Sequence, residues 1–479
     1  MILRVINHPY EFDMKNLCIT FFPHEKIRLE GEEDPVVVTT RRETDGSFFV
    51  SAKVYDVYRE TTAKPEPADE EHLVLSVTLY RLLSGILGFA PPWGVLYGVR
   101  PAKLMHRLCA QMGDDAAVAH FQTAFLTQKS KAELAHEVML HENRSIARSG
   151  PKSFSLYVSI PFCPTRCAYC SFVSHSIEKT HKLMTPYVDL LLRELEETSK
   201  YAKELGLDLA TVYFGGGTPT TLSAQDLGRI FSTIEQNFDL SHLMEYTVEA
   251  GRPDTVTRER LEVIRAAGVQ RISINPQSFN DKVLEAIGRR HTAQQTLDAF
   301  ALARDCGFDH INMDFIAGLP EDDLPSFQRS IQTALDLQAE SITVHTLALK
   351  TSAYMVTREQ TFDLKDRLTV SNMVDYAGQT LHGAGYYPYY MYRQSKSLGN
   401  LENVGWCKPG YDCLYNVYMM DETHTVLAVG AGAVTKLRGQ NSGMIERIYN
   451  YKYPYEYIRD FDTLLERKKR IPGFYAEYD

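Results

Sequence analysis

Three closely spaced cysteines in the middle of the chain are the residues best suited to chemistry. Cys163, Cys167 and Cys170 have the spacing C-x3-C-x2-C, and they are three of the eight cysteines in the sequence. Thiolates are soft ligands, and three of them on one short segment can face a common point, as three corners of an iron–sulfur cube require. Such a triad leaves one iron open for another ligand. The spacing alone also allows a zinc ion with a distant fourth ligand, or unrelated buried thiols.

The residues around the cysteines narrow these alternatives. The pattern CxxxCxYC, with Tyr169 before the last cysteine, resembles the radical S-adenosylmethionine (SAM) superfamily. The longer string YVSIPFCPTRCAYC, which starts at Tyr157, resembles the oxygen-independent coproporphyrinogen III dehydrogenases and their relatives. The chain as a whole resembles the HemZ type of this branch. It departs from the branch at Ser159, where many members carry a histidine.

The resemblance implies two cofactors. A [4Fe–4S] cluster on Cys163, Cys167 and Cys170 would bind the amino and carboxylate groups of SAM at its open iron. One electron would then cleave SAM to methionine and a 5′-deoxyadenosyl radical, while the protein orients the cofactor and excludes water. In the dehydrogenases this radical takes a hydrogen from the β-carbon of a porphyrinogen propionate. Loss of CO2 and an electron then leaves a vinyl group.

The resemblance also implies a tetrapyrrole substrate and an electron donor such as flavodoxin or ferredoxin. Repetition of the reaction at a second propionate converts coproporphyrinogen III to protoporphyrinogen IX. Two other functions occur in the same branch, haem binding by a chaperone and anaerobic haem breakdown by a SAM-derived radical. Arginines and a tyrosine-rich wall would suit a carboxylate-bearing tetrapyrrole, but dense tyrosines also occur at ordinary packed interfaces.

A glycine run follows the next strand-like segment. Gly215–Pro219 reads GGGTP, and glycines allow close backbone approach and leave N–H groups free for a polar ligand. By itself such a run usually indicates only a turn. Behind a CxxxCxxC strand it resembles the family motif that contacts the amino and carboxylate groups of SAM, and Gly216, Gly217 and Thr218 are the matching positions.

Further candidate residues follow later strands. The Glu249 carboxylate can accept two hydrogen bonds from ribose hydroxyls, although a capping or salt-bridged surface acid fits its position equally well. Some relatives bind a second SAM, and the positions matching their second site are Gln277, Arg289, Asp314 and Ala348. An aspartate inside an apolar strand is costly unless it is paired, so Asp314 has the strongest physical support. A solvated charged loop is the alternative for Arg289. The full set of expected cofactor contacts is Tyr157, Tyr169, Gly216, Gly217, Thr218, Glu249, Gln277, Arg289, Asp314 and Ala348.

These residues must be positioned by a repeating strand–helix pattern. The predicted strands are 156–160, 211–214, 245–249, 271–275, 310–315 and 341–346. The predicted amphipathic helices between them include 186–205, 224–238, 258–267 and 293–306. Alternating strands and helices indicate a parallel sheet. Six units are too few for a closed eightfold barrel, and they match the open (β/α)6 partial barrel that the resemblance implies. Sites in such sheets lie at the carboxyl ends of the strands.

We therefore predict an α/β protein with three regions: an α+β N-terminal domain at 1–150, the partial barrel at 151–370, and a small C-terminal region at 371–479. The first region should contain a hairpin between 36–40 and 48–55, turning at Asp45-Gly46, and a helix at 72–89. The loop 91–104 carries Arg100 and Lys103; we interpret it as an interface loop in preference to an anion site. Only 43 residues follow Lys436, too few for the helical substrate-capping domain of typical coproporphyrinogen dehydrogenases.

The remaining cysteines are expected to be structural. Cys407 and Cys413, with His424 as the nearest further ligand, offer too few groups for a second metal site. Cys18, Cys109 and Cys306 are predicted to be core residues.

Composition indicates an ordinary globular protein. Of the 479 residues 44% are hydrophobic and 23% charged, and the net charge of −10 argues against nucleic acid as the main partner. Clustered thiols in a long chain indicate a reducing compartment and a metal, and not a disulfide scaffold. The apolar stretch 73–99 is interrupted by Arg81, Pro91 and Pro92, so we expect no membrane span. The N-terminus has no long apolar segment, and a cytoplasmic location is expected.

Overall fold

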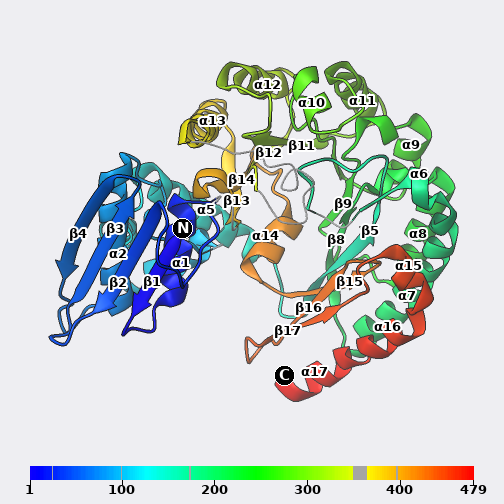
Figure 1. Ribbon diagram of the computed structural model, residues 1–479. Helices are drawn as coiled ribbons and strands as arrows, with labels where there is room; N and C mark the ends of the chain where they lie inside the picture. Colours follow the sequence, from blue (N-terminus) through cyan, green and yellow to red (C-terminus); the bar gives the residue numbers. More distant parts are fainter. Residues whose placement is uncertain (24, 99, 172–173, 349–363, 395–396) are drawn as a thin grey trace.

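The structure is a computed structural model that describes residues 1–479 except 24, 99, 172–173, 349–363 and 395–396. It contains a four-stranded sheet near the N-terminus, a much larger sheet of eleven strands, and a short two-stranded ladder. The small sheet lies to one side of the large one, which curves into an open crescent (Figure 1).

The N-terminal sheet has its own hydrophobic core. Its strands, in spatial order, are β1 (Ile2–Ile6), β2 (Val36–Arg42), β3 (Phe48–Val54) and β4 (Val57–Ala63). The predicted hairpin is confirmed as β2 and β3, which pair antiparallel. Two helices pack against this sheet: α1 (Glu11–Phe21) and α2 (Glu71–Leu87). Apolar side chains such as Met14, Phe48 and Leu79 are fully buried between these layers.

Three further N-terminal helices belong to a different core. They are α3 (Pro101–Met112), α4 (Asp114–Thr123) and α5 (Lys129–Ile146). Their buried residues Met105, Phe121 and Val138 join the hydrophobic core of the large sheet, and α5 packs against its edge strand β13. These helices thus share a core with the barrel, although the predicted boundary after residue 150 places them in a separate domain.

The six predicted barrel strands are present and parallel, which confirms the partial barrel. They are β5 (Ser153–Ile160), β8 (Asp208–Gly216), β9 (Glu245–Glu249), β10 (Arg271–Ser273), β11 (His310–Ala317) and β12 (Ser341–Thr346). The large sheet also includes β13 (Tyr387–Arg393), β14 (Glu402–Cys407), β15 (Thr425–Val429), β16 (Val434–Arg438) and β17 (Ile445–Tyr449).

The strands after residue 370 extend this sheet at both edges. β14 pairs antiparallel with β12 and is followed by β13, whereas β15 pairs parallel with β5 and adds a seventh parallel strand. β16 and β17 continue antiparallel beyond β15. The predicted boundary at residue 370 lies inside α13 (Leu364–Gly383), and the segment that follows it completes the main sheet.

Helices cover the convex side of the crescent (Figure 1). Along the chain they are α6 (Ile177–Thr180), α7 (Met184–Glu204), α8 (Ala224–Asn237), α9 (Arg258–Ala266), α10 (Asp281–Ala286), α11 (Ala293–Asp305), α12 (Leu324–Asp336) and α13. Short 3-10 turns lie at His181–Leu183, Pro219–Thr221, Pro253–Thr255 and Leu398–Asn400. Several helices begin at side chains that accept a hydrogen bond from the first turn, such as Ser223 for α8 and Thr292 for α11.

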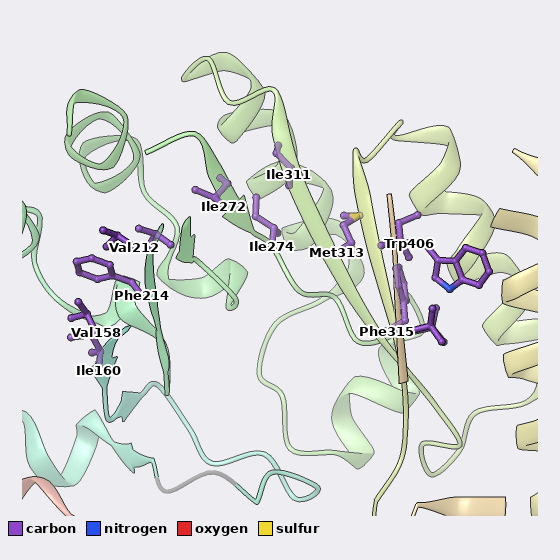
Figure 2. Packing of buried hydrophobic residues seen from close by; sticks show 14 of the residues in the cluster. Val158, Ile160, Val212, Phe214, Ile272, Ile274, Ile311, Met313, Phe315 and Trp406 are labelled. Carbon is purple, nitrogen blue, oxygen red and sulfur yellow. The ribbon is translucent and has the colours of Figure 1, made fainter. Parts of the chain in front are cut away.

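The barrel strands divide sharply into two faces because successive side chains of a strand point to opposite sides. One face is apolar and packs under the helices, with Val158, Phe214, Ile272, Met313 and Phe315 fully buried (Figure 2). The residues between them on the same strands are polar or aromatic: Tyr157, Tyr213, Thr247, Glu249, Ser273, Asn312, Asp314, Thr343 and His345. The concave face therefore offers functional groups instead of a hydrophobic core.

The C-terminal segment closes the molecule. α14 (Leu414–Asp421) lies on the concave side of the crescent, and α15 (Pro454–Arg459), α16 (Phe461–Lys468) and α17 (Arg470–Tyr478) lie near β15–β17 (Figure 1). α15 and α16 pack against α7. Their docking centres on a fully buried ion pair, in which Lys468 Nζ lies 2.7 Å from Glu194 Oε1.

Candidate active site

The cysteine segment follows β5 and is held by backbone hydrogen bonds. Cys163 ends the short strand β6 (Phe162–Cys163), which pairs with β7 (His175–Ser176). Cys167 accepts a hydrogen bond from Cys170 N at 3.2 Å, and Ala168 N donates to Ile287 O at 2.9 Å. Cys167 is buried, whereas Cys163 and Cys170 are half-buried. The thiols thus lie at the carboxyl end of the sheet, as predicted.

The glycine turn after β8 packs directly on this segment. Gly217 N donates to Ile160 O and Thr218 N to Phe162 O, both at 2.7 Å. Thr218 Oγ1 lies 3.5 Å from Cys163 Sγ. A Cβ on Gly217 would lie 2.5 Å from Phe162 O and 3.0 Å from Cys163 Sγ, so only glycine fits there. The N–H groups of Gly217 and Thr218 thus bond within the chain, which corrects the expectation that the glycine run leaves them free for a ligand.

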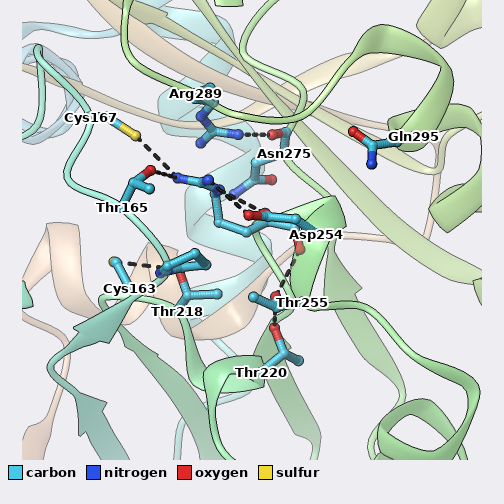
Figure 3. A network of polar contacts seen from close by, with 12 residues as sticks. Cys163, Thr165, Cys167, Thr218, Thr220, Asp254, Thr255, Asn275, Arg289 and Gln295 are labelled. Atoms are coloured by element: carbon cyan, nitrogen blue, oxygen red, sulfur yellow. Dashed lines mark hydrogen bonds and ion pairs between the residues drawn. The ribbon is translucent and has the colours of Figure 1, made fainter. Parts of the chain in front are cut away.

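A buried arginine that the sequence analysis missed joins the cysteine loop to the end of β9. Arg252 is 3% exposed, and its Nη1 donates to Thr165 Oγ1 at 3.2 Å and to Cys167 Sγ at 3.6 Å. Its other nitrogens hold both oxygens of Asp254 at 3.0 Å (Figure 3). The signal in the sequence is the Arg-Pro-Asp run that begins three residues after Glu249, at the end of the same strand as that site residue.

Arg289 approaches the same loop from the far side. Its Nη1 donates to Asn275 O at 2.6 Å and its Nη2 to Tyr169 Oη at 3.2 Å. The side chain is buried, and interaction with the Tyr169 hydroxyl and the Cys167 thiol raises its pKa against the opposing effect of burial. The alternative of a solvated charged loop is therefore wrong for Arg289, although Arg290 is exposed and pairs with Glu178. The guanidinium groups of Arg252 and Arg289 thus both interact with Cys167.

Glu249 lies on the concave face and is coupled to its neighbours. Its Oε1 accepts a hydrogen bond from Tyr213 Oη at 2.6 Å, and the Tyr213 ring lies beside the Tyr157 ring, with centroids 6.2 Å apart. Burial raises the pKa of Glu249 to about 7, and the Asp314 charge adds to this rise. The alternative of a capping or surface acid is wrong, because no helix cap or salt bridge is formed by Glu249 among the described contacts.

The residues that match a second SAM site gather across β10–β12. Gln277 has a positive φ of 67°, and its N and O bond to Asp314 O and Ile316 N at 2.9 and 3.2 Å. Asp314 accepts from Asn312 Nδ2 at 2.8 Å and lies 3.9 Å from His345 Nε2. The histidine and the amide lower the Asp314 pKa against the effect of burial. Ala348 forms an isolated bridge with Ser397 at the end of the described part of this segment.

Tyrosines and α14 form a floor beneath these groups. The Tyr415 ring stacks on Tyr213 with centroids 4.4 Å apart and on Tyr157 at 5.9 Å. The backbone N–H groups of Leu414 and Tyr415 donate to the buried carboxylate of Glu245 near the start of β9. Tyr415 and α14 thus pack directly against the concave-face residues of β5, β8 and β9.

Several other sequence candidates lie elsewhere. Cys407 and Cys413 are buried near Tyr389 and Tyr390, and Cys413 Sγ donates to Glu245. His424 contacts Ser149 and Ser155 through its two ring nitrogens at 2.8 Å, so these residues form no second metal centre.

The segment 91–104 contacts the C-terminal segment, which agrees with its prediction as an interface, but its last four residues belong to α3 and not to a loop. Its Arg100 pairs with Glu422, and Lys103 Nζ bonds Asp421 O at 2.8 Å. Cys18 is buried as predicted, but Cys109 and Cys306 are only half-buried, which corrects the prediction that both are core residues.

Comparison with known proteins identifies the family. Residues 157–334 match the radical SAM superfamily. The chain is 34% identical over 470 residues to the oxygen-independent coproporphyrinogen-III oxidase-like protein HemZ of Bacillus subtilis, covering 95% of this chain and 94% of that protein. The chain belongs to the radical SAM superfamily, in its HemN- and HemZ-like family.

Two other radical SAM relatives show how widely the family varies. The haem chaperone HemW of Bacillus subtilis is 31% identical over 318 residues, covering 64% of this chain and 79% of that protein. The coproporphyrinogen III oxidase HemN of Escherichia coli has the same fold, with a TM-score of 0.51 and 22% identity over 68% of this chain and 72% of that one.

As a radical SAM protein the chain uses a [4Fe–4S] cluster and S-adenosylmethionine. The residues present fit these groups. Buried Arg289 has an Nε atom without a hydrogen-bond partner beside the cysteine loop. Arg252 and Arg289 supply positive charge where an anionic cluster would lie. No helix in the described part of the chain is long and apolar enough to cross a membrane.

The raised pKa of Glu249 predicts a pH-dependent affinity for SAM. If the ribose hydroxyls of SAM donate to Glu249, as the sequence predicts, the ionised carboxylate should bind them more strongly than the protonated form. With a pKa of about 7, affinity should fall by roughly tenfold between pH 8 and pH 6. Isothermal titration of SAM into anaerobic protein measures this. Glu249→Gln, which cannot ionise, should bind weakly at both pH values and lose the dependence. An unchanged profile in that variant would remove Glu249 from the site.

Arg252 is expected to raise the reduction potential of the cluster. A positive hydrogen-bond donor at Cys167 Sγ stabilises the more negative, reduced cluster. Arg252→Gln removes one charged hydrogen bond, so the potential should fall by about 60 mV, the equivalent of roughly 1.5 kcal/mol. Redox titration followed by electron paramagnetic resonance measures the shift. Arg258→Gln is the matched control, because Arg258 donates to the unrelated Cys306 at 3.8 Å. Equal potentials in the two variants would contradict this role.

Proposed function

We propose that the chain is an oxygen-independent coproporphyrinogen III dehydrogenase, which converts two propionates to vinyl groups in haem biosynthesis. The observation that carries this proposal is the likeness to HemZ along 95% of the chain. That likeness includes the N-terminal sheet and the C-terminal strands, which lie outside the region 157–334 that matches the superfamily.

In this proposal the cofactor supplies the chemistry, since a reduced cluster delivers one electron to SAM and so generates a 5′-deoxyadenosyl radical. The chain's residues bind and orient. Cys163, Cys167 and Cys170 hold the cluster. The turn at Gly216–Thr218 would accept hydrogen bonds from the amino group of SAM through its backbone carbonyls, because the N–H groups of Gly217 and Thr218 already donate to Ile160 O and Phe162 O. Glu249 accepts hydrogen bonds from the ribose, and Tyr157 and Tyr169 complete the wall beside the cysteine loop.

A second SAM molecule would use Gln277, Arg289, Asp314 and Ala348. Support comes from the backbone contact between two of these residues, since Gln277 N donates to Asp314 O at 2.9 Å and the Asp314 carboxylate lies beside His345. Asp314 keeps a lowered pKa beside His345 and Asn312, so it remains an ionised hydrogen-bond acceptor at neutral pH. The bulk of the tetrapyrrole would approach at the carboxyl ends of the strands, where sites in such sheets lie.

The test is anaerobic turnover of coproporphyrinogen III by cluster-reconstituted protein with SAM and a reductant, with products identified by mass. We expect loss of CO2 from two propionates and formation of 5′-deoxyadenosine. Asp314→Asn and Gln277→Ala should lower conversion at least tenfold, the equivalent of about 1.4 kcal/mol, while iron content stays unchanged. Asp298→Asn, at an exposed carboxylate on α11, is the control and should behave as wild type.

Haem binding as a chaperone is the second candidate function. It is favoured by the likeness to HemW, of which this chain covers 79%. Under this alternative the protein would bind haem tightly, yield no decarboxylated product and be insensitive to Asp314→Asn. Ring-opened products formed from haem would instead indicate a haem-degrading radical SAM enzyme. The same reaction mixtures distinguish the three outcomes.

A further inference from the structure

A second group of metal-ligand side chains lies among the N-terminal helices. Cys109 near the end of α3, Asp114 at the start of α4 and His136 on α5 converge at one point. Their ligand atoms all lie within 4.8 Å of one another. Gly113, with a φ of 85°, reverses the chain between α3 and α4 and so brings Cys109 and Asp114 together. Among the described residues, no other group of three or more His, Cys, Asp or Glu side chains has its ligand atoms this close together.

The ligand types suit zinc. Zinc binds thiolate sulfur at about 2.3 Å and imidazole nitrogen or carboxylate oxygen at about 2.0–2.2 Å, so ligand atoms around one ion lie roughly 3.3–3.8 Å apart. His136 Nε2 and Asp114 Oδ2 are already 3.1 Å apart. Asp114 is 56% exposed and therefore free to adjust its rotamer. A single cysteine excludes an iron–sulfur cluster at this place, since such clusters need several thiolates.

The contacts around His136 leave a binding atom unused. Its Nε2 is buried and makes no hydrogen bond despite its closeness to the Asp114 carboxylate. Two ligands of one metal ion lie close together without pointing a hydrogen at each other, and His136 Nε2 and Asp114 Oδ2 are arranged in this way. An unsatisfied buried nitrogen is costly, and a bound cation would satisfy it.

We propose that Cys109, Asp114 and His136 bind a single zinc ion, with water as the fourth ligand on the exposed side. The ion adds a further, metal-mediated link among helices that already meet through side-chain packing, the Gly113 turn and the His136–Asp114 pair. α5 is the helix that docks on β13, and its Lys131 pairs with the buried Glu402 of β14. Zinc at this point stabilises the packing of α3, α4 and α5 on one another, and these helices connect the small N-terminal sheet to the barrel. The site shares no residue with the cysteine loop.

Zinc retention measures the site directly. Full-length protein with its iron–sulfur cluster in place is equilibrated with zinc, desalted and analysed for zinc and iron by mass spectrometry. Wild type should retain about one zinc per chain, as expected for a single site. Asp114→Asn, at an exposed position, and Cys109→Ser should each lose at least nine-tenths of it. The matched controls are Cys306→Ser and His120→Asn, which replace the same residue types outside the group.

Absorption at the zinc edge then identifies the ligands without interference from iron. We expect one sulfur neighbour at about 2.3 Å in wild type, absent from Cys109→Ser. Equal zinc retention in all variants, or a zinc ion without a sulfur neighbour, would overturn the proposal. Zinc that disappears when Cys163, Cys167 and Cys170 are replaced, and not when Cys109 is replaced, would place the metal in the cluster site and would also overturn it.

Discussion

Replacement of Cys163, Cys167 and Cys170 together by alanine should abolish the iron–sulfur cluster. A [4Fe–4S] cluster needs thiolate ligands, and the other cysteines offer no comparable group. Burial raises the pKa of Cys163, so the thiol is protonated until iron displaces the proton. After anaerobic reconstitution, iron should fall from about four per chain in wild type to background, with loss of the brown absorption.

Misfolding of the triple variant could also cause loss of iron, so the experiment needs a control for the effect of cysteine replacement on folding. Cys306→Ala combined with Cys18→Ala serves as the control, because neither thiol lies near the cysteine loop; iron content should stay at the wild-type level. Iron near the wild-type value in the triple variant would show that the assignment is wrong. Partial retention would direct attention to Cys407 and Cys413, which are buried together beneath the concave face.

The barrel strands could be predicted because the pattern that indicates each strand lies within its own few residues. Val158 and Ile160, or Val212 and Phe214, alternate with polar residues and lie in β-branched or aromatic runs. The site residues were predicted from their places at the ends of these strands together with the family resemblance. The same alternation already separates the two faces, and it marks Tyr213 and His345 as concave-face residues that the sequence analysis did not select.

The remaining features depend on contacts between distant segments. β15 pairs with β5 although more than 260 residues separate them in sequence, and nothing in its short apolar run VLAV specifies a parallel partner. Arg252 was missed because its burial follows from the fold of the cysteine loop over it. The stacking of Tyr415 on Tyr213 likewise arises only after α14 enters the crescent.

Lys468→Met should strongly destabilise the protein, because it leaves a carboxylate unpaired in the interior. Both Lys468 and Glu194 have fully buried side chains, 2.7 Å apart. Removal of one partner from such a pair typically costs about 3–5 kcal/mol. In a chain of this size the midpoint of thermal unfolding should fall by roughly 5 °C. The neighbouring Lys469→Met is the control, since that ion pair is exposed and should contribute less than about 1 kcal/mol.

A double variant tests the origin of the effect. Glu194→Gln with Lys468→Met removes the unpaired charge, so it should recover part of the lost stability. Glu194 also accepts hydrogen bonds from Gly430 N at 2.8 Å and Tyr457 Oη at 2.6 Å, which a glutamine oxygen can keep in part. If Lys468→Met were as mild as Lys469→Met, the C-terminal helices would not be docked on α7 as the structure has them.

The same variant should also weaken cluster retention. Gly430 and Ala431 follow β15, and Ala431 O accepts a hydrogen bond from Ser159 Oγ at 2.8 Å. Ser159 lies four residues before Cys163. A loosened C-terminal segment therefore removes support from the strand end that presents the cysteines. Iron should be lost faster to a chelator from Lys468→Met than from Lys469→Met at a temperature where both are folded. Equal loss rates would show that the C-terminal segment stabilises the fold without supporting the cysteine loop.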